Sequence, residues 1–242
     1  MRARADYTAR DVNVVPAASL LAEPTRAAML TAMLDDRPLA AGELARLAGV
    51  SPATASAHLA RLLHGGLVTV ISQGRHRYYR LAGPEVAAVM EALAHLSPVA
   101  PVRSLRQSQD AAALAQARTC YDHLAGRAGV ALLDALLARR LLVAPPTDGL
   151  PERFEVTTDG LATLSSFGLD IGTLKRTRRR FAGACLDWTE RKPHLNGALG
   201  AAVTARLFGL GWLERGSRRR AVRVTPAGAE GLAATFGWSL EG

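Results

Sequence analysis

The feature that most constrains the fold is a break between two helical segments in the first third of the chain. The segment from Leu39 has the composition of a helix, and Gly49 ends it, because glycine readily adopts the left-handed backbone that a tight turn needs. Ser51 then caps a second helix, and Pro52 occupies its first position, where a missing N–H costs nothing. Two helices joined by so short a turn predict a helix-turn-helix.

A hairpin follows the second helix. Residues 67–71 are rich in β-branched side chains, and residues 76–81 form the expected returning strand, with Gln73-Gly74-Arg75 as the turn. The order helix, turn, helix, hairpin predicts a winged helix-turn-helix with a basic wing tip. The buried stripe of the second helix is expected at Leu59, Leu62 and Leu63.

The motif residues of this region resemble those of the ArsR/SmtB family of transcription regulators. The resemblance covers about residues 14–96 and implies a homodimer whose two recognition helices address a palindromic DNA site. It also implies dimer contacts through residues 14–22 and 86–93, and a repressor that an effector commonly releases from DNA. The matching positions are Ser51-Pro52-Ala53-Thr54-Ala55-Ser56-Ala57-His58-Leu59, Leu62, Gly66-Leu67-Val68, Gly74-Arg75 and Tyr79-Arg80-Leu81.

The second helix and the wing carry side chains suited to operator DNA. Thr54 and Ser56 are short enough for close approach to the major groove, near the helix N-terminus that reaches base edges. Arg75 and Arg77 can enter the minor groove or hold phosphates. His58 can face either the DNA or the core, where it would bond a neighbouring group. The expected DNA-binding residues are Ser51, Pro52, Thr54, Ser56, His58, Arg61, Gln73, Arg75, His76 and Arg77.

The charge balance agrees with nucleic acid as the partner. The chain has 30 Lys and Arg against 21 Asp and Glu, a formal net charge of +9, and each cation that contacts a phosphate releases counterions. An Arg-rich protein without a nucleic-acid partner would carry the same charge, so composition alone leaves both open. The alternative function is a winged-helix module for protein association or assembly without operator specificity, against which Thr54, Ser56, Arg75 and Arg77 argue.

Two further classes of protein are not expected. No Gly-rich phosphate loop, Gly-x-Ser-x-Gly elbow or paired-carboxylate motif stands out, so the sequence predicts no enzyme. No apolar run is long enough to span a bilayer, and residues 1–10 lack the apolar stretch of a signal peptide. We therefore expect a cytoplasmic protein with no membrane partner.

The rest of the chain predicts a second domain. We place the winged helix-turn-helix at 12–96, a linker rich in Pro, Arg and Gln at 97–112, and a C-terminal effector or assembly domain at 113–242. This domain holds two similar segments, about 118–170 and 183–238. The expected fold class is mainly α with small β-hairpin wings, in which the winged helix-turn-helix precedes a duplicated, degenerate winged-helix-like domain.

Paired motifs define the repeat. Cys120-Tyr121-Asp122-His123 matches Cys185-Leu186-Asp187-Trp188, and the run from Gly129 matches the run from Gly197 after a short insertion. Each copy is expected to run helix, helix, strand, turn, and then a helix opened by Thr-x-x-Gly.

The only two cysteines of the chain occupy equivalent positions in the two copies, and a pseudo-two-fold packing would let them meet. Three interpretations stay open: buried core positions, ligands of a transition metal such as zinc, or a redox switch. The metal or redox candidates are Cys120, His123, Cys185 and His194, with Asp122 and Asp187 available to complete a tetrahedral set.

An organic effector has one candidate binding position in the C-terminal domain. An organic effector could occupy an apolar pocket lined by Tyr121, Trp188, Phe208 and Trp212, with Arg118 or Asp122 orienting it.

In many members of the resembled family, by contrast, cysteines in the helix before the recognition helix sense metals. Residues 43–48 contain none here, and Glu91 with His95 in the helix after the wing is only a weak pair. We expect no metal sensing at these family positions.

Overall fold

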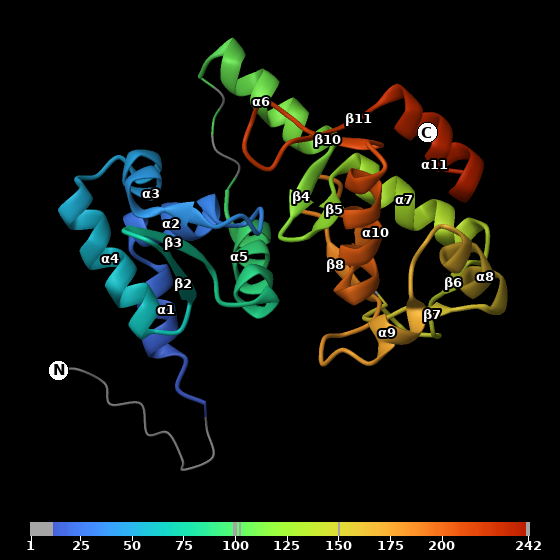
Figure 1. Cartoon of the computed structure of the whole chain (residues 1–242), viewed down its shortest axis with the longest axis horizontal. Helices are drawn as coiled ribbons and strands as arrows, with labels where there is room; N and C mark the ends of the chain where they lie inside the picture. Colours follow the sequence, from blue (N-terminus) through green and yellow to red (C-terminus); the bar gives the residue numbers. More distant parts are fainter. Residues whose placement is uncertain (1–11, 99–100, 102, 150, 241–242) are drawn as a thin grey trace. The chain divides into compact units, whose positions relative to one another are not determined.

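The computed structural model describes residues 12–98, 101, 103–149 and 151–240 (Figure 1). The chain divides into an N-terminal unit that ends at Met90 and a C-terminal unit that begins at Glu91. No helix in the described part of the chain has the length and apolar character needed to cross a membrane.

The N-terminal unit is the expected winged helix-turn-helix. Its three strands form one antiparallel sheet in the order β1-β3-β2, and the wing pairs Val68 with Leu81 at its base and Gln73 with His76 near its tip. The elements are α1 (Val15–Leu21), α2 (Pro24–Ala32), β1 (Leu39–Ala40), α3 (Ala41–Ala48), α4 (Pro52–His64), β2 (Val68–Gln73), β3 (His76–Leu81) and α5 (Pro84–Leu96), which continues across the unit boundary.

Local chemistry sets the ends of these helices. Gly49 takes a left-handed φ of 67° at the end of α3, and the Ser51 hydroxyl accepts a hydrogen bond from the Thr54 amide at the start of α4. Both features follow the sequence prediction. The Glu23 carboxylate caps α2 by accepting hydrogen bonds from the amides of Thr25 and Arg26.

The core of the N-terminal unit lies beneath α2, α3, α4 and the sheet. Leu59 and Leu62 are fully buried as expected, whereas Leu63 is 40% exposed. The prediction for Leu63 was wrong because successive helix positions are about 100° apart, so Leu63 falls outside the narrow buried stripe. The other large core side chains are Met29, Leu30, Met33, Leu44 and Leu81.

The C-terminal unit begins with the end of α5 and with α6 (Leu105–Gln116), which forms within the segment expected as a linker. One order of elements then occurs twice: hairpin, helix, two short strands, helix. The first series is β4 (Arg118–Cys120), β5 (His123–Ala125), α7 (Arg127–Ala138), β6 (Leu142–Val143), β7 (Glu155–Val156) and α8 (Thr158–Ser166). After α9 (Ile171–Lys175), the second is β8 (Gly183–Leu186), β9 (Pro193–Asn196), α10 (Gly197–Gly209), β10 (Leu213–Arg215), β11 (Val222–Val224) and α11 (Pro226–Phe236).

Each series opens with a β-hairpin where a helix was expected. All residues of β4 and β5 are buried, so the hairpin has no polar–apolar alternation by which the sequence could reveal it. Tyr121, with a φ of 59°, helps to close its two-residue turn. The final helices follow the prediction, because the hydroxyls of Thr157 and Thr225 accept hydrogen bonds from the amides of Gly160 and Gly228.

The two series share one core. Helix α7 packs on β9 and α10 packs on β5, so each central helix covers the hairpin of the other series. Gly129 of α7 lies against the Leu124 carbonyl, and Gly200 of α10 lies in the same way against Leu195. Gly129 therefore corresponds to Gly200, and the sequence pairing of Gly129 with Gly197 was out of register by three residues. The register error arose because the turn between β8 and β9 is longer than the turn between β4 and β5.

Candidate functional sites

The N-terminal half of α4 presents an exposed polar face. Ser51, Pro52, Thr54 and Ser56 are all exposed, and the hydroxyls of Ser51 and Thr54 lie 2.9 Å apart. Ala55 between them is fully buried and anchors the helix to the core. The first two turns of α4 thus combine short side chains with hydroxyl donors, which permits close approach to base edges and phosphates.

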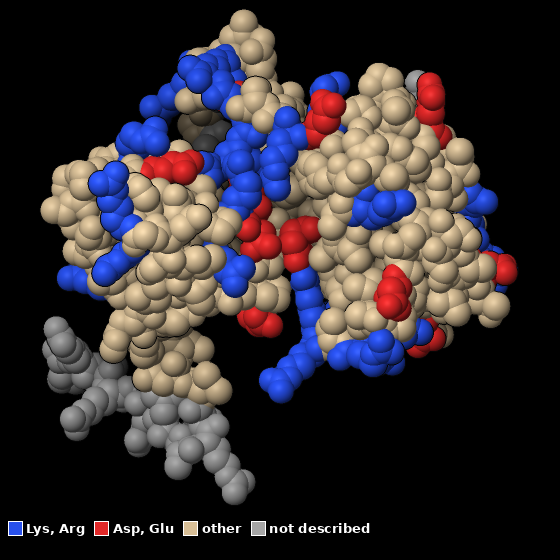
Figure 2. Space-filling view, in the orientation of Figure 1, with Lys and Arg blue, Asp and Glu red and all other residues tan. Residues whose placement is uncertain are grey.

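The wing adds basic side chains to the same unit. Gln73, Arg75, His76 and Arg77 are exposed around the hairpin tip, where Gly74 has a left-handed φ of 57°. Arg61 is exposed on the C-terminal half of α4. Figure 2 shows Lys and Arg side chains spread over the face drawn, with Asp and Glu in smaller groups.

His58 differs from the other candidate DNA contacts. Its Nδ1 lies 3.3 Å from Oε2 of Glu23, and its side chain is 16% exposed. This contact with the cap of α2 favours the packed histidine that the sequence left open. The Glu23 pKa is lowered to about 2, because hydrogen bonds from the amides of Arg26 and Thr25 outweigh the opposing effect of burial, and the His58 charge adds to them.

Four side chains of the C-terminal unit converge on one point. Cys120, His123, Cys185 and His194, here called the Cys/His cluster, each offer one ligand atom, and these atoms all lie within 4.8 Å of one another. Cys120 pairs with His123 across β4 and β5, and Cys185 pairs with His194 across β8 and β9, so each hairpin supplies one thiol and one imidazole. The cluster is the whole set of metal or redox candidates named from the sequence.

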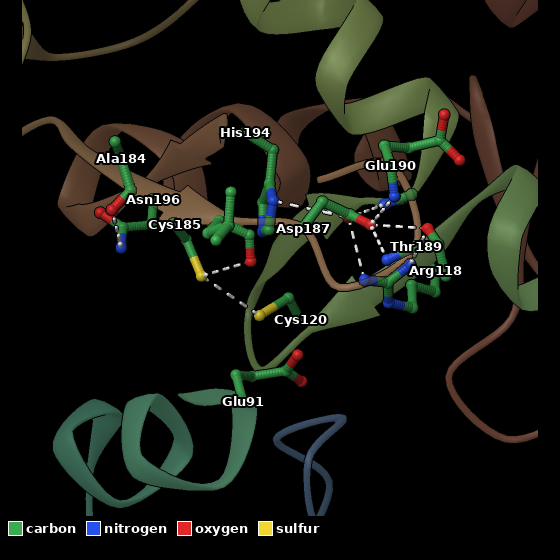
Figure 3. Close-up of polar contacts among 12 residues, drawn as sticks. Glu91, Arg118, Cys120, Ala184, Cys185, Asp187, Thr189, Glu190, His194 and Asn196 are labelled. Atoms are coloured by element: carbon green, nitrogen blue, oxygen red, sulfur yellow. Dashed lines mark hydrogen bonds and ion pairs between the residues drawn. The ribbon is translucent and has the colours of Figure 1, made fainter. Parts of the chain in front are cut away.

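The cluster is compact and buried. The two sulfur atoms are 3.9 Å apart without a disulfide bond, and Figure 3 shows the cysteines pointing toward one another. The imidazole rings of His123 and His194 stack with their centroids 5.1 Å apart. Cys120, His123 and His194 are buried, and Cys185 is half-buried. A tetrahedral zinc site with bonds of 2.0–2.3 Å places its ligand atoms about 3.3–3.8 Å apart, so small side-chain movements would close this one.

Three imidazole nitrogens of the cluster are buried without a hydrogen bond, although one of them, Nδ1 of His194, lies within ion-pair distance of Asp187. Nε2 of His123 and both nitrogens of His194 accept or donate no hydrogen bond within the described residues. Such atoms are rare in folded proteins because each one costs about 1–3 kcal/mol. They are the observation that distinguishes this cluster from an ordinary packed core.

A carboxylate lies close to Nδ1 of each histidine in the cluster. Nδ1 of His123 lies 3.2 Å from Asp122, and Nδ1 of His194 lies 3.5 Å from Asp187. Asp122 is bound in turn by Arg179, and Asp187 by the fully buried Arg118. Both rings therefore direct Nδ1 toward a carboxylate, an arrangement that metal-bound histidines commonly show.

The neighbours of Asp187 also tie the cluster to the fold. Its carboxylate accepts hydrogen bonds from the amide of Gly126, at the start of α7, and from Thr189. Sequence reasoning treated Asp122 and Asp187 as further ligands, and the structure places them outside the ligand set. It did not identify Arg118 and Arg179 as their partners, because these contacts join residues more than 50 positions apart.

The groups of the cluster have displaced pKa values. The hydrogen bond with Cys185, and then burial, raise the pKa of the Cys120 thiol. Burial would lower the pKa of His123, but Cys120 and Asp122 together raise it to about 9. Burial and the positive charge of His123 hold the pKa of His194 well below its usual value.

Three of the aromatic residues proposed for an organic effector each pack against a different partner. Trp188 lies under the guanidinium of Arg118, 4.5 Å from it, whereas Trp212 packs against Phe167 with ring centroids 5.6 Å apart. Phe208 lies under Arg215. Phe208 and Trp212 both pack against the apolar core of the C-terminal unit. Glu91 forms an ion pair with Arg220, and Nε2 of His95 lies 2.9 Å from the carbonyl oxygen of Leu186.

Comparisons with known proteins agree with the N-terminal architecture. A family model described as a helix-turn-helix domain matches residues 21–71. A relative from Bacillus subtilis (strain 168), the uncharacterized HTH-type transcriptional regulator YdfF, is 43% identical over 216 residues, which are 89% of this chain and 93% of the relative. The match to this relative therefore extends over both units.

Solved structures match a shorter part of the chain. Reduced HlyU from Vibrio cholerae N16961 is 32% identical and covers 36% of this chain and 90% of its own, with a TM-score of 0.32. The homodimeric winged helix-turn-helix DNA-binding domain of Mb0332 from Mycobacterium bovis, described as a possible ArsR-family transcriptional regulator, is 34% identical. It covers 33% of this chain and 73% of its own, with a TM-score of 0.31.

Proposed function

Because the chain belongs to the family of HTH-type transcriptional regulators, we propose that it is a homodimeric repressor whose operator binding is controlled by a transition metal in the Cys/His cluster. The DNA contacts are assigned to the N-terminal half of α4 and to the wing. The effector is assigned to the C-terminal unit. Metal-free protein binds the operator, and metal loading releases it, as the ArsR/SmtB resemblance implies.

The assignment of the DNA contacts rests on the exposed face of α4. Ser51, Thr54 and Ser56 stand together at the N-terminus of the helix, and Arg75 and Arg77 are exposed at the wing tip. This combination serves base contact and phosphate contact at once. Selection of bound sequences from a random duplex library tests it. A palindromic consensus is expected, and the failure to enrich any sequence would favour a protein-association module.

The homodimer is supported by apolar side chains that the N-terminal unit leaves uncovered. Helix α1 has no buried residue, and Val14 and Val15 at its start are 60% and 56% exposed. Val89 of α5 is 46% exposed. Burial of such side chains by a second copy stabilises a dimer, at about 25 cal/mol per Å² of apolar surface. Light scattering coupled to size exclusion is expected to give twice the 25.6 kDa chain mass.

The unpartnered imidazole nitrogens carry the metal assignment. A metal ion would bind Nε2 of each histidine and the two thiolates, which satisfies the two Nε2 atoms that have no hydrogen-bond partner. Two thiolates and two neutral imidazoles leave a zinc site with no net charge, which suits a buried position. The ligand chemistry also suits other thiophilic ions, such as Cu(I).

Metal titration separates this assignment from the two alternatives. We expect one Zn(II) per chain by elemental analysis, and a tetrahedral thiolate spectrum when Co(II) replaces it. Cys185→Ser should abolish both, whereas the exposed control Ser165→Ala should not. Wild-type protein that binds no metal but forms a Cys120–Cys185 disulfide with diamide would support the redox switch. Protein that neither binds metal nor forms the disulfide would favour the interpretation of both cysteines as buried core positions.

A further inference from the structure

The C-terminal part of α5 contacts the strands of the Cys/His cluster on both sides. Glu91 and His95 stand one helical turn apart on this helix, and both belong to the C-terminal unit. Glu91 is linked through Arg220 to Thr119, which precedes Cys120. His95 contacts Leu186, which follows Cys185.

The first contact runs through Arg220. The Glu91 carboxylate is buried and forms an ion pair with Arg220, whose Nε donates a hydrogen bond of 3.1 Å to the carbonyl of Thr119. The Thr119 amide donates in return to the Arg220 carbonyl, at 2.8 Å. Thr119 is the immediate neighbour of Cys120 on β4. Figure 3 shows Glu91 directed from its helix toward Cys120.

The second contact is direct. Nε2 of His95 lies 2.9 Å from the carbonyl oxygen of Leu186, within hydrogen-bonding distance. Leu186 is the immediate neighbour of Cys185 on β8, and the Cys185 sulfur lies 4.0 Å from the same carbonyl oxygen. Each contact thus ties α5 to the backbone beside one cysteine of the cluster, directly for Cys185 and through Arg220 for Cys120.

Helix α5 contains residues of both units of the chain. The helix starts at Pro84, three residues after the wing strand ends at Leu81, and continues without a break to Leu96. Its residues before Glu91 belong to the DNA-binding unit. A helix is a stiff element that can carry a displacement along its length.

We infer that Glu91, acting through Arg220, and His95 are the positioning residues that transmit occupancy of the Cys/His cluster along α5 to the DNA-binding unit. This inference rests on the proposed metal control of operator binding. When the ligands close on an ion, the strands beside Thr119 and Leu186 shift, and the two contacts pull α5 with them. Without these contacts, the cluster still binds its ion, but the wing and α4 do not respond.

The test compares a double variant, Glu91→Gln with His95→Ala, with wild type and with the control Glu85→Gln. Glu85 is exposed on the first turn of the same helix, so its variant makes a similar charge change away from the cluster. Zn(II) affinity and operator affinity, with and without Zn(II), are measured for each protein. The operator is the palindrome selected from the random library.

Wild type and Glu85→Gln are expected to lose about 10- to 100-fold in operator affinity when zinc binds, a usual range for coupled sites. The double variant is expected to bind zinc as wild type does, because neither side chain is among the four candidate ligands. Its operator affinity should change less than about threefold on zinc binding, because the coupling contacts are gone. A full zinc response in the double variant would overturn the inference and leave metal control intact. A wild type that binds zinc without any response would overturn both.

Hydrogen exchange on wild-type protein provides a readout that does not depend on the variants folding. Zinc loading is expected to slow amide exchange in the last turns of α5, at Glu91–Leu96, as well as in β4 and β8. Slowed exchange confined to the strands of the cluster, with α5 unchanged, would contradict transmission through this helix.

Discussion

An imidazole buried without hydrogen bonds is costly, and the residues around such a ring indicate why a protein keeps it. In the Cys/His cluster, His123 and His194 each turn Nδ1 toward a carboxylate, which leaves Nε2 facing the other ligand atoms. The carboxylates orient the rings and raise their basicity as ligands.

Asp122→Asn should weaken zinc binding without removing it. The variant keeps the shape of the side chain but loses the charge that faces His123 and Arg179, so zinc affinity is expected to fall about 10- to 100-fold. Competition with a chromophoric chelator measures the change. Asp134→Asn, an exposed site on α7, is the control and should match wild type. Equal affinities for the two variants would show that Asp122 does not support the site.

Removal of the proposed DNA contacts should weaken operator binding. In the triple variant Thr54→Ala, Ser56→Ala, Arg75→Ala, each lost contact is worth about 1 kcal/mol or more, so affinity should fall at least about 100-fold. Loss of the Arg75 phosphate contact should also reduce the salt dependence by about one counterion. Fluorescence anisotropy across salt concentrations measures both. The control Ser165→Ala, Ser166→Ala on α8 should bind as wild type does; an unaffected triple variant would refute the assignment.

Glu23 should stabilise the N-terminal unit in a pH-dependent way. Its pKa is about 2 in the folded protein and about 4.3 in an unfolded chain, so its contribution is complete above about pH 5 and is lost as the pH falls toward 2. Glu23→Ala should therefore unfold at lower urea concentration than wild type at pH 7. The gap between the two midpoints should shrink between pH 5 and pH 2. A gap independent of pH would contradict the role of the carboxylate.

At the scale of elements, the sequence predicts what local chemistry determines. Gly49, Ser51 and the wing turn mark their elements by backbone preference and capping, so α3, α4, β2 and β3 could be placed from the sequence. The buried hairpin β4–β5 has no such signal, and its position depends on packing against α10. The four side chains of the Cys/His cluster could be named as candidates from composition and repeat, but their convergence depends on that packing.

The close approach between α10 and the hairpins makes Gly200 a sensitive position. A Cβ there would lie 2.5 Å from the Leu195 carbonyl oxygen and 3.4 Å from Cβ of His123. Gly200→Ala should therefore reduce the free energy of unfolding by about 1–3 kcal/mol and weaken zinc binding. Gly209→Ala, in the same helix, meets no atom within 4 Å and should be neutral or stabilising by up to about 1 kcal/mol. Urea denaturation and zinc titration distinguish the two; similar behaviour of both variants would contradict the packing argument.

At the scale of the whole molecule, one continuous helix, α5, extends from the DNA-binding unit into the C-terminal unit that holds the Cys/His cluster. The N-terminal unit carries the family's winged helix-turn-helix, and the relative that spans both units is also an HTH-type transcriptional regulator. Because linkage is reciprocal, an ion that weakens operator binding must itself bind more weakly to the operator-bound protein, and by the same factor. Operator DNA should therefore lower the zinc affinity of the full-length chain.

The most direct test is the operator affinity of metal-free and zinc-loaded protein, measured by anisotropy at one salt concentration with wild type and Cys185→Ser. We predict that zinc weakens wild-type binding at least about 10-fold and leaves Cys185→Ser unchanged at its metal-free affinity. Equal operator affinities of wild type with and without bound zinc would contradict the account. So would a zinc response that survives in Cys185→Ser, because the effect would then arise outside the Cys/His cluster.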